Sequence, residues 1–194
     1  MPTALEELAV EASTCTRCAL AAGRTQVVFG TGDPRADLLF VGEGPGAEED
    51  RQGLPFVGRS GQLLDRLLLE EIGLTRDRVY IANVVKCRPP DNRDPLPVEI
   101  DACRPYLQRQ LELIDPRVVV TLGKFAGQLL LESKVPITKL RGQAYRFGRA
   151  VLIPTVHPAY ALRGGAEPMA HLRADFVRAK LALAESAPVP ESDS

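Results

Sequence analysis

One stretch near the start of the chain, residues 36–68, constrains the possible folds more than any other. It opens with the apolar run Leu38-Leu39-Phe40-Val41, which is typical of a buried strand. Three glycines and a proline follow between Gly42 and Gly46, and leucines spaced for one face of a helix come next. A strand, a glycine-rich loop and a helix in this order form the ligand-binding edge of open α/β sheets. The spacing of the glycines matches neither the dinucleotide-binding fingerprint nor the P-loop, and a plain turn is the alternative.

The rest of the sequence alternates strands with helices. Further strands are predicted at residues 79–85, 117–122 and 151–156. Helices are predicted at residues 3–12, 60–73, 97–114, 124–131 and 169–185. This alternation predicts a three-layer α/β/α fold with a central, mainly parallel four-stranded sheet. We also expect a hairpin within the basic, irregular segment 134–149.

The length of 194 residues predicts a single domain, which we place at residues 1–186, followed by a disordered tail at 187–194. No apolar run approaches the ~18 residues that a membrane-spanning helix needs. The N-terminus carries Glu6 and Glu7 where a signal peptide would carry basic residues. We therefore expect a cytoplasmic monomer with no membrane partner.

Polar side chains follow three of the predicted strands at their carboxyl ends. These are Glu43, Asn83 and His157. Any one of them alone would more often cap a helix or fill the core. Because the carboxyl ends of parallel strands share one edge of a sheet, we expect the three to converge on one crevice. An isolated aromatic residue in the glycine-rich loop, Phe56, adds a surface on which a flat ligand can stack, or else it belongs to the core.

The four cysteines predict a metal site. Cys15 and Cys18 have Cys-x2-Cys spacing, whereas Cys87 and Cys103 lie far along the chain, each followed by Arg-Pro. A cytosolic protein does not keep structural disulfides, so buried thiols and metal ligands are the alternatives. Zinc usually takes a second close pair or nearby histidines, which are missing here, so four thiolates favour a [4Fe–4S] cluster over zinc. The cluster would tie the N-terminal segment to the 86–103 connection.

The charge is nearly balanced overall, with a formal net charge of −1, but it is unevenly distributed. Residues 133–166 contain no acidic residue. They carry several basic ones, namely Lys134, Lys139, Arg141, Arg146, Arg149 and Arg163. Such a run is expected of a surface that faces phosphates, and a solvated charged face is the alternative.

At this point the sequence resembles the iron–sulfur (family 4) uracil-DNA glycosylases, and the likeness runs from Cys15 to about Arg173. The motifs that carry it are Gly42-Glu43-Gly44-Pro45-Gly46, Pro55-Phe56-Val57-Gly58, Asn83-Val84-Val85-Lys86-Cys87-Arg88-Pro89-Pro90, Cys103-Arg104-Pro105, Thr121-Leu122-Gly123 and His157-Pro158-Ala159-Tyr160. The resemblance implies a hydrolase that flips uracil out of DNA and leaves an abasic site in base excision repair. It also implies that the four cysteines hold a structural [4Fe–4S] cluster.

The resemblance assigns roles to particular residues. It implies that Phe56 stacks on the base, that Asn83 reads its Watson–Crick edge, and that the Gly42–Gly44 backbone also contacts it. His157 would donate a hydrogen bond to uracil O2 as negative charge develops there. Glu43 would position the attacking water or stabilise the cationic sugar, and Glu49 or Asn92 would share that task.

Two departures from the family pattern matter. The family often has Leu-Leu after His-Pro-Ala-Tyr, whereas this chain has Ala161-Leu162, which leaves the residue that wedges into the duplex open between Leu162 and Arg163. Related enzymes that trap DNA covalently carry a histidine after the second strand, and residues 91–94 here contain none. We therefore expect an enzyme that releases its DNA product and does not trap it covalently. The rival functions are a non-catalytic nucleic-acid-binding protein and an electron-transfer protein.

Overall fold

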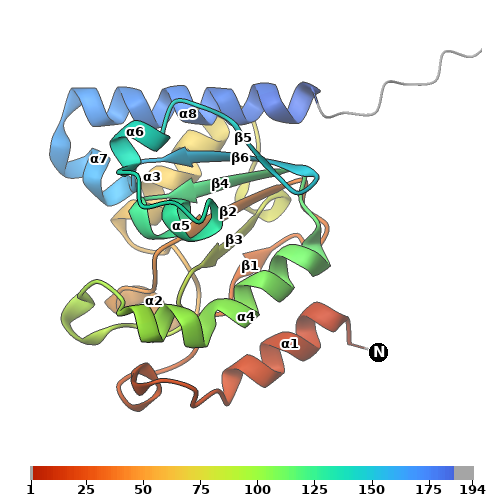
Figure 1. Ribbon diagram of the computed structural model, residues 1–194, viewed down its shortest axis with the longest axis vertical. Coiled ribbons are helices and arrows are strands. Elements are labelled where there is room, and N and C mark those ends of the chain that lie inside the picture. The colour runs from red at the N-terminus through yellow and green to blue at the C-terminus, as the bar shows by residue number, and fades with distance from the viewer. Residues whose placement is uncertain (1, 186–194) are drawn as a thin grey trace, which may run out of the picture.

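The computed structural model describes residues 2–185, so the tail expected at 187–194 lies outside the described residues. A six-stranded sheet crosses the molecule and has helices on both faces (Figure 1). Leu38 and Phe40 belong to a hydrophobic cluster that includes residues of α3 (Arg59–Leu67) and α8 (Ala166–Glu185). Leu39 and Val41 belong to the cluster on the other face, together with residues of α1 (Ala4–Ser13) and α4 (Pro97–Ile114). The predicted α/β architecture is confirmed.

The strand order is β1-β3-β2-β4-β6-β5. The four inner strands run parallel and match the four predicted ones: β2 (Leu38–Gly42), β3 (Tyr80–Asn83), β4 (Val118–Leu122) and β6 (Ala150–Thr155). The prediction of a four-stranded sheet is wrong, because an antiparallel strand lies at each edge. These are β1 (Thr31–Gly32), beside β3, and β5 (Tyr145–Phe147), beside β6. Both are too short to show the alternating pattern by which strands are found in a sequence.

The long helices match their predictions well. α4 has the predicted bounds, and α5 (Lys124–Leu130) and α8 differ from theirs by a few residues at most. α3 continues into a π-helical turn that ends at Gly73, whose φ of 84° is the conformation expected of a C-terminal glycine. Sequence reasoning missed three short helices that follow a glycine or open beside a proline, namely α2 (Ala47–Gln52), α6 (Ile137–Leu140) and α7 (Pro158–Gly164).

The sheet brings the predicted site residues to one edge. Gly42 at the end of β2 is in register with Asn83 at the end of β3. On the other side of β2, β4 pairs with β6 up to Leu122 and Thr155. Because these strands are parallel, the segments that follow β2, β3 and β6 all emerge on the same side of the molecule.

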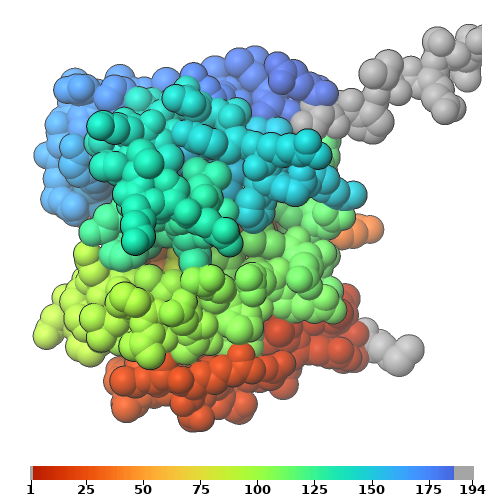
Figure 2. All heavy atoms as spheres, viewed as in Figure 1, coloured from red at the N-terminus to blue at the C-terminus, as the bar shows by residue number. Residues whose placement is uncertain are grey.

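The N-terminal segment lies along α4 on the opposite face of the sheet from α8, as the red and green surfaces in Figure 2 show. The contact between α1 and α4 brings together parts of the chain that are about ninety residues apart in sequence. No helix within residues 2–185 is long and apolar enough to cross a membrane.

Candidate active site

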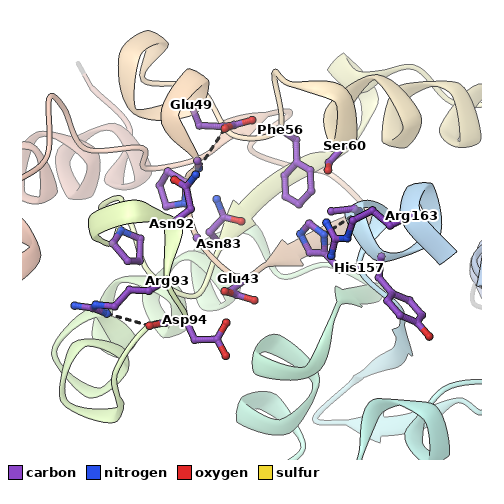
Figure 3. A pocket seen from close by; sticks show the side chains of 16 residues that line it. Glu43, Glu49, Phe56, Ser60, Asn83, Asn92, Arg93, Asp94, His157 and Arg163 are labelled. Atoms are coloured by element: carbon purple, nitrogen blue, oxygen red, sulfur yellow. Dashed lines mark hydrogen bonds between the residues drawn. The ribbon is translucent and has the colours of Figure 1, made fainter.

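A cavity of about 490 Å³ opens at the carboxyl edge of the sheet. Figure 3 shows its lining side chains, which come from the glycine-rich loop, the end of β3, the 89–94 segment and α7. Nearly all the residues expected in the site line this cavity: Glu43, Gly44, Glu49, Phe56, Asn83, Asn92, His157 and Arg163. The structure adds residues that the motifs did not single out for the site, among them Ser60, Asp94 and Tyr160.

Gly42 does not line the cavity but allows two other residues to meet behind it. A Cβ atom at position 42 would lie 2.4 Å from Asn83 Oδ1 and 2.6 Å from the ring of Phe56, well inside van der Waals contact. Only a glycine therefore fits between the base-reading candidate and the stacking candidate. This close approach is the physical reason for the first glycine of the motif.

Asn83 is 2% exposed, and its Oδ1 has no hydrogen-bond partner within residues 2–185. An unpaired buried polar atom is costly, by about 1–3 kcal/mol, so such atoms are uncommon in the interior of a folded protein. Here the amide stands at the wall of the cavity, where a ligand can supply the missing donor. Asn83 is thus a ready acceptor for an N–H group.

Glu49 shapes the loop that carries Phe56. Its Oε1 accepts hydrogen bonds from the backbone N–H groups of Val57 and Gly58 at 3.0 and 3.1 Å, and its Oε2 accepts one from Gly46 at 3.2 Å. Both carboxylate oxygens are therefore engaged with the backbone. These contacts favour a role in holding the loop over the expected share in positioning water.

Glu43 is half-buried beside Asp94, and its carboxylate accepts no hydrogen bond from the described part of the chain. Burial and, to a smaller extent, the negative charge of Asp94 together raise the pKa of Glu43 to about 7, against an opposing effect of Lys124. Lys124 is itself paired with Asp94 at 2.9 Å. Glu43 can consequently exchange a proton near neutral pH.

His157 caps α7 through one ring nitrogen and offers the other to the cavity. Its Nδ1 accepts a hydrogen bond from the backbone N–H of Ala159 at 3.1 Å. Burial and, to a smaller extent, the positive charge of Arg163 together lower the pKa of His157 to about 4, against an opposing effect of Glu49. The imidazole is therefore neutral at physiological pH, with its proton on Nε2. Its ring stacks at 26° to that of Phe56, with the centroids 5.7 Å apart.

Comparisons with known proteins decide the family. The model of the uracil DNA glycosylase superfamily matches residues 29–179. A type-4 uracil-DNA glycosylase of Thermotoga maritima is 52% identical over 151 residues, which cover 77% of this chain and 78% of that protein. Another, of Sulfurisphaera tokodaii, is 46% identical over 166 residues, or 81% of this chain and 76% of that protein. A third, of Archaeoglobus fulgidus, is 45% identical over 81% of this chain and 83% of its own length.

The chain belongs to the uracil-DNA glycosylase superfamily. Its likeness to the type-4 members confirms the resemblance seen in the motifs. Type-5 uracil-DNA glycosylases match over a smaller part of the chain; the one from Thermus thermophilus is 36% identical over 54% of it.

The basic run of this glycosylase-family chain does not form one surface. Arg163 lines the cavity, but Arg141 pairs with Asp175, which is fully buried, at 2.9 Å. Arg146 and Arg149 lie at the β5–β6 hairpin, at the end of β6 that is far from His157 (Figure 1). Of the expected phosphate-facing residues named here, only Arg163 borders the cavity. Leu162, the other candidate for a wedge, is 38% exposed on α7 outside the cavity lining.

The four cysteines of this superfamily member line a second, small pocket of about 20 Å³. Its other polar walls are basic or aromatic, namely Arg17, Arg24, Lys86 and Tyr106. Arg24 donates to Cys87 Sγ at 3.4 Å. Within residues 2–185 no three potential ligands lie close enough together to hold a single metal ion. Four thiols spread around one pocket, with no carboxylate or imidazole among them, fit the donor set of a thiolate-bound cluster.

Lys86 contacts one lining residue of each of the two pockets of the glycosylase fold. It is 1% exposed, and its Nζ donates to the backbone O of Asn83 at 2.8 Å and to Gln110 Oε1 at 2.5 Å. Its backbone N–H donates to Cys103 Sγ at 3.3 Å. A single residue thus contacts a wall of the cysteine pocket and the main chain of Asn83.

Proposed function

We propose that this protein is a monofunctional uracil-DNA glycosylase that flips uracil out of DNA and hydrolyses its N-glycosidic bond, leaving an abasic site. One observation carries this function. A single cavity combines an aromatic ring, a buried amide with an unpaired oxygen and a neutral imidazole donor, contributed by Phe56, Asn83 and His157. These groups meet the separate needs of holding, reading and releasing a pyrimidine base.

Recognition of the base rests on Asn83. Its unpaired Oδ1 accepts the N3–H of uracil, and its Nδ2 donates to O4. Cytosine presents an unprotonated N3 and an N4 amino group, so both contacts are mismatched, at a cost of about 1–3 kcal/mol for each buried bond left unmade. Phe56 provides a face for stacking, which repays part of the cost of taking the base out of the helix.

Cleavage of the glycosidic bond places negative charge on the departing uracil and positive charge on the sugar. His157 donates from Nε2 to O2, because its Nδ1 is already occupied by the Ala159 N–H. A neutral donor suits this role, since it can strengthen its hydrogen bond to a developing anion while it keeps its proton. His157 therefore acts mainly in the transition state.

Glu43 in its ionised form orients the attacking water or stabilises the cationic sugar. Its position in the cavity and its lack of a hydrogen-bond partner within residues 2–185 leave the carboxylate free for either task. Asn92 lines the same cavity, but its Oδ1 accepts from Arg88 Nε at 2.7 Å, so it serves to shape the wall. Arg163 and Leu162 on α7 would meet the DNA beside the flipped nucleotide.

The cysteine pocket would hold a [4Fe–4S] cluster through Cys15, Cys18, Cys87 and Cys103. The cationic walls support this proposal, since a cluster bound by four thiolates carries negative charge. When bound, the cluster supplies structural cross-linking and takes no part in hydrolysis. The cluster would then join the N-terminal segment, which carries Cys15 and Cys18, to the connection that follows β3. We place both within one domain at residues 1–186.

The decisive experiment uses an oligonucleotide with one uracil. The protein is incubated with it, the DNA is heated in alkali, and strand scission at the abasic site is measured. We expect scission at uracil and none at cytosine or thymine in matched oligonucleotides. A protein that binds this DNA but leaves every base in place would instead be a non-catalytic binding protein, and one that does neither would favour electron transfer.

A further inference from the structure

Phe56 has an unusual backbone conformation for a large side chain. Its φ is 52°, in the left-handed region that aromatic residues rarely adopt. Such conformations persist only where the surrounding contacts fix them. The peptide groups after Phe56 are fixed by Glu49, which accepts from the N–H groups of Val57 and Gly58. The carbonyl side of Phe56 needs a separate partner.

Arg76 supplies that partner. It lies in the 3₁₀ turn Arg76–Arg78 that precedes β3. Its Nη1 donates to the backbone O of Phe56 at 2.7 Å, and its Nη2 donates to the backbone O of Pro55. The guanidinium is also paired with Asp65 of α3 at 3.1 Å. A planar fork of N–H donors suits two successive carbonyls, which a lysine ammonium cannot match in the same way.

The helix beneath the loop leaves little room for the peptide of Phe56 to move. A Cβ atom at Gly61 would lie 1.7 Å from the backbone O of Phe56, so α3 approaches this peptide as closely as a glycine permits. Arg76 therefore holds the carbonyl from one side while α3 blocks the other. Arg76 does not itself line the cavity.

We propose that Arg76 is a positioning residue for Phe56, which keeps the ring in the orientation on which the flipped uracil stacks. The inference rests on the proposed function, but the contact itself can be tested without DNA. Loss of the fork frees the two carbonyls, and the strained backbone of Phe56 then relaxes toward an ordinary conformation. The ring leaves the wall of the cavity, and capture of the base weakens before the chemical step does.

The first test observes the ring directly. The chain contains four tyrosines but no tryptophan, so Phe56→Trp introduces a single tryptophan whose emission can be excited selectively. In that background we expect Arg76→Ala to shift the emission to longer wavelength and to increase quenching by acrylamide. Arg78→Ala is the matched control, since Arg78 lies in the same turn, is exposed and forms no ion pair within residues 2–185. Identical spectra for the two variants would overturn the proposal.

The second test separates capture from chemistry. Single-turnover excision is measured over a range of enzyme concentrations. For Arg76→Ala we expect the half-saturating concentration to rise about tenfold, because part of the base-stacking interaction is lost, while the limiting rate changes little. Arg76→Lys should restore part of the loss, and Asp65→Asn should have a milder effect because both carbonyl contacts remain. A loss confined to the limiting rate would refute the assignment.

The outcomes distinguish this inference from the proposed function. If the unmodified protein leaves uracil in DNA, the proposed function fails, and the tryptophan reporter still decides whether Arg76 holds position 56. Thermal melting of each variant shows whether it is folded. If Arg76→Ala does not fold, Arg76→Lys and Arg76→Gln carry both tests, and reporter spectra equal to those of Arg78→Ala would again overturn the proposal.

Discussion

At the scale of single residues, the cap that His157 provides for α7 is compatible with its proposed role as a hydrogen-bond donor to the departing base. Its Nδ1 caps α7, and this bond determines which ring nitrogen carries the proton. The cap and the oxyanion donor are often weighed as alternatives for a lone histidine. Here the cap creates the donor, because it leaves Nε2–H directed away from the helix.

Replacement of His157 by alanine should therefore impair the chemical step. The loss of one donor to a developing oxyanion typically costs about 10²–10³ in rate. We expect a decrease of that order in single-turnover excision, with nearly unchanged binding to uracil-containing DNA. The control is His171→Ala on α8, outside the cavity lining, which should excise at the normal rate. Unimpaired cleavage by His157→Ala would refute its role.

The pH dependence should be governed by Glu43. Its pKa is raised to about 7, so the ionised form predominates above that pH and is lost as the pH falls through it. The rate of excision at subsaturating enzyme should decline below about pH 7, with the steepness expected when a single group, the Glu43 carboxylate, takes up one proton. His157, whose pKa is lowered to about 4, adds no change in this range. Asp94→Asn should move the midpoint to lower pH, since Asp94 raises the pKa of Glu43, and an unmoved midpoint would contradict this origin.

Asn83→Asp should change which base is accepted. A carboxylate repels uracil O4 but can accept from the N4 amino group of cytosine. We expect uracil excision to fall steeply while discrimination against cytosine narrows. Excision rates on matched uracil and cytosine oligonucleotides give the ratio. If this variant excises uracil at the wild-type rate, Asn83 does not take part in recognition of the base.

At the scale of secondary-structure elements, Asp175 links α8 to the sheet and to the segment after α6. It is fully buried, and it accepts from Thr155 of β6 at 2.8 Å as well as from Arg141. The basic run that suggested a DNA-facing surface is thus partly an internal support. Charge alone could not reveal this from the sequence, because the partner acid lies 34 positions further along the chain.

Asp175→Ala should lower the free energy of unfolding by about 3–5 kcal/mol, because it leaves the Arg141 charge partly buried and unpaired. Urea denaturation measures the difference. Arg178→Ala is the control: Arg178 pairs with the same carboxylate but is 37% exposed, and its loss should cost about 1 kcal/mol or less. Equal losses in the two variants would contradict a special role for the buried pair.

At the scale of the whole molecule, two pockets lie on one framework, and the proposed cluster would join its N-terminal segment to its centre. Protein purified without oxygen should be brown and should hold about four iron atoms per chain. Cys103→Ser should lower the melting temperature more than it changes the limiting rate of excision. A colourless protein with one zinc per chain would contradict the cluster.

The sequence was most informative where the chain obeys a long regular pattern. The four parallel strands and α4 could be predicted because each is a sustained apolar or amphipathic run. The edge strands and short helices could not, since each is too short to show a periodic pattern. β1, for example, is defined by the pairing of Thr31 and Gly32 with β3, which lies far along the chain.

The same distinction applies to the site. Glu43, Asn83 and His157 were predictable because strand ends converge in a parallel sheet. Two other contacts depend on loop conformation, for which a sequence carries no periodic signal. Glu49 accepts hydrogen bonds from backbone N–H groups, and Arg76 donates one to the Phe56 carbonyl. The left-handed φ of Phe56 could not be predicted for the same reason.

Lys86 also restricts how this protein can change through evolution. Its ammonium contacts the carbonyl of Asn83, and its side chain also lines the cysteine pocket, where its positive charge opposes the rise that burial causes in the pKa of Cys103, so a substitution there affects both pockets. A lineage that replaced Lys86 would lose both the support behind Asn83 and the positive charge beside the cysteines. Sequence changes at the two pockets are therefore expected to be coupled through position 86.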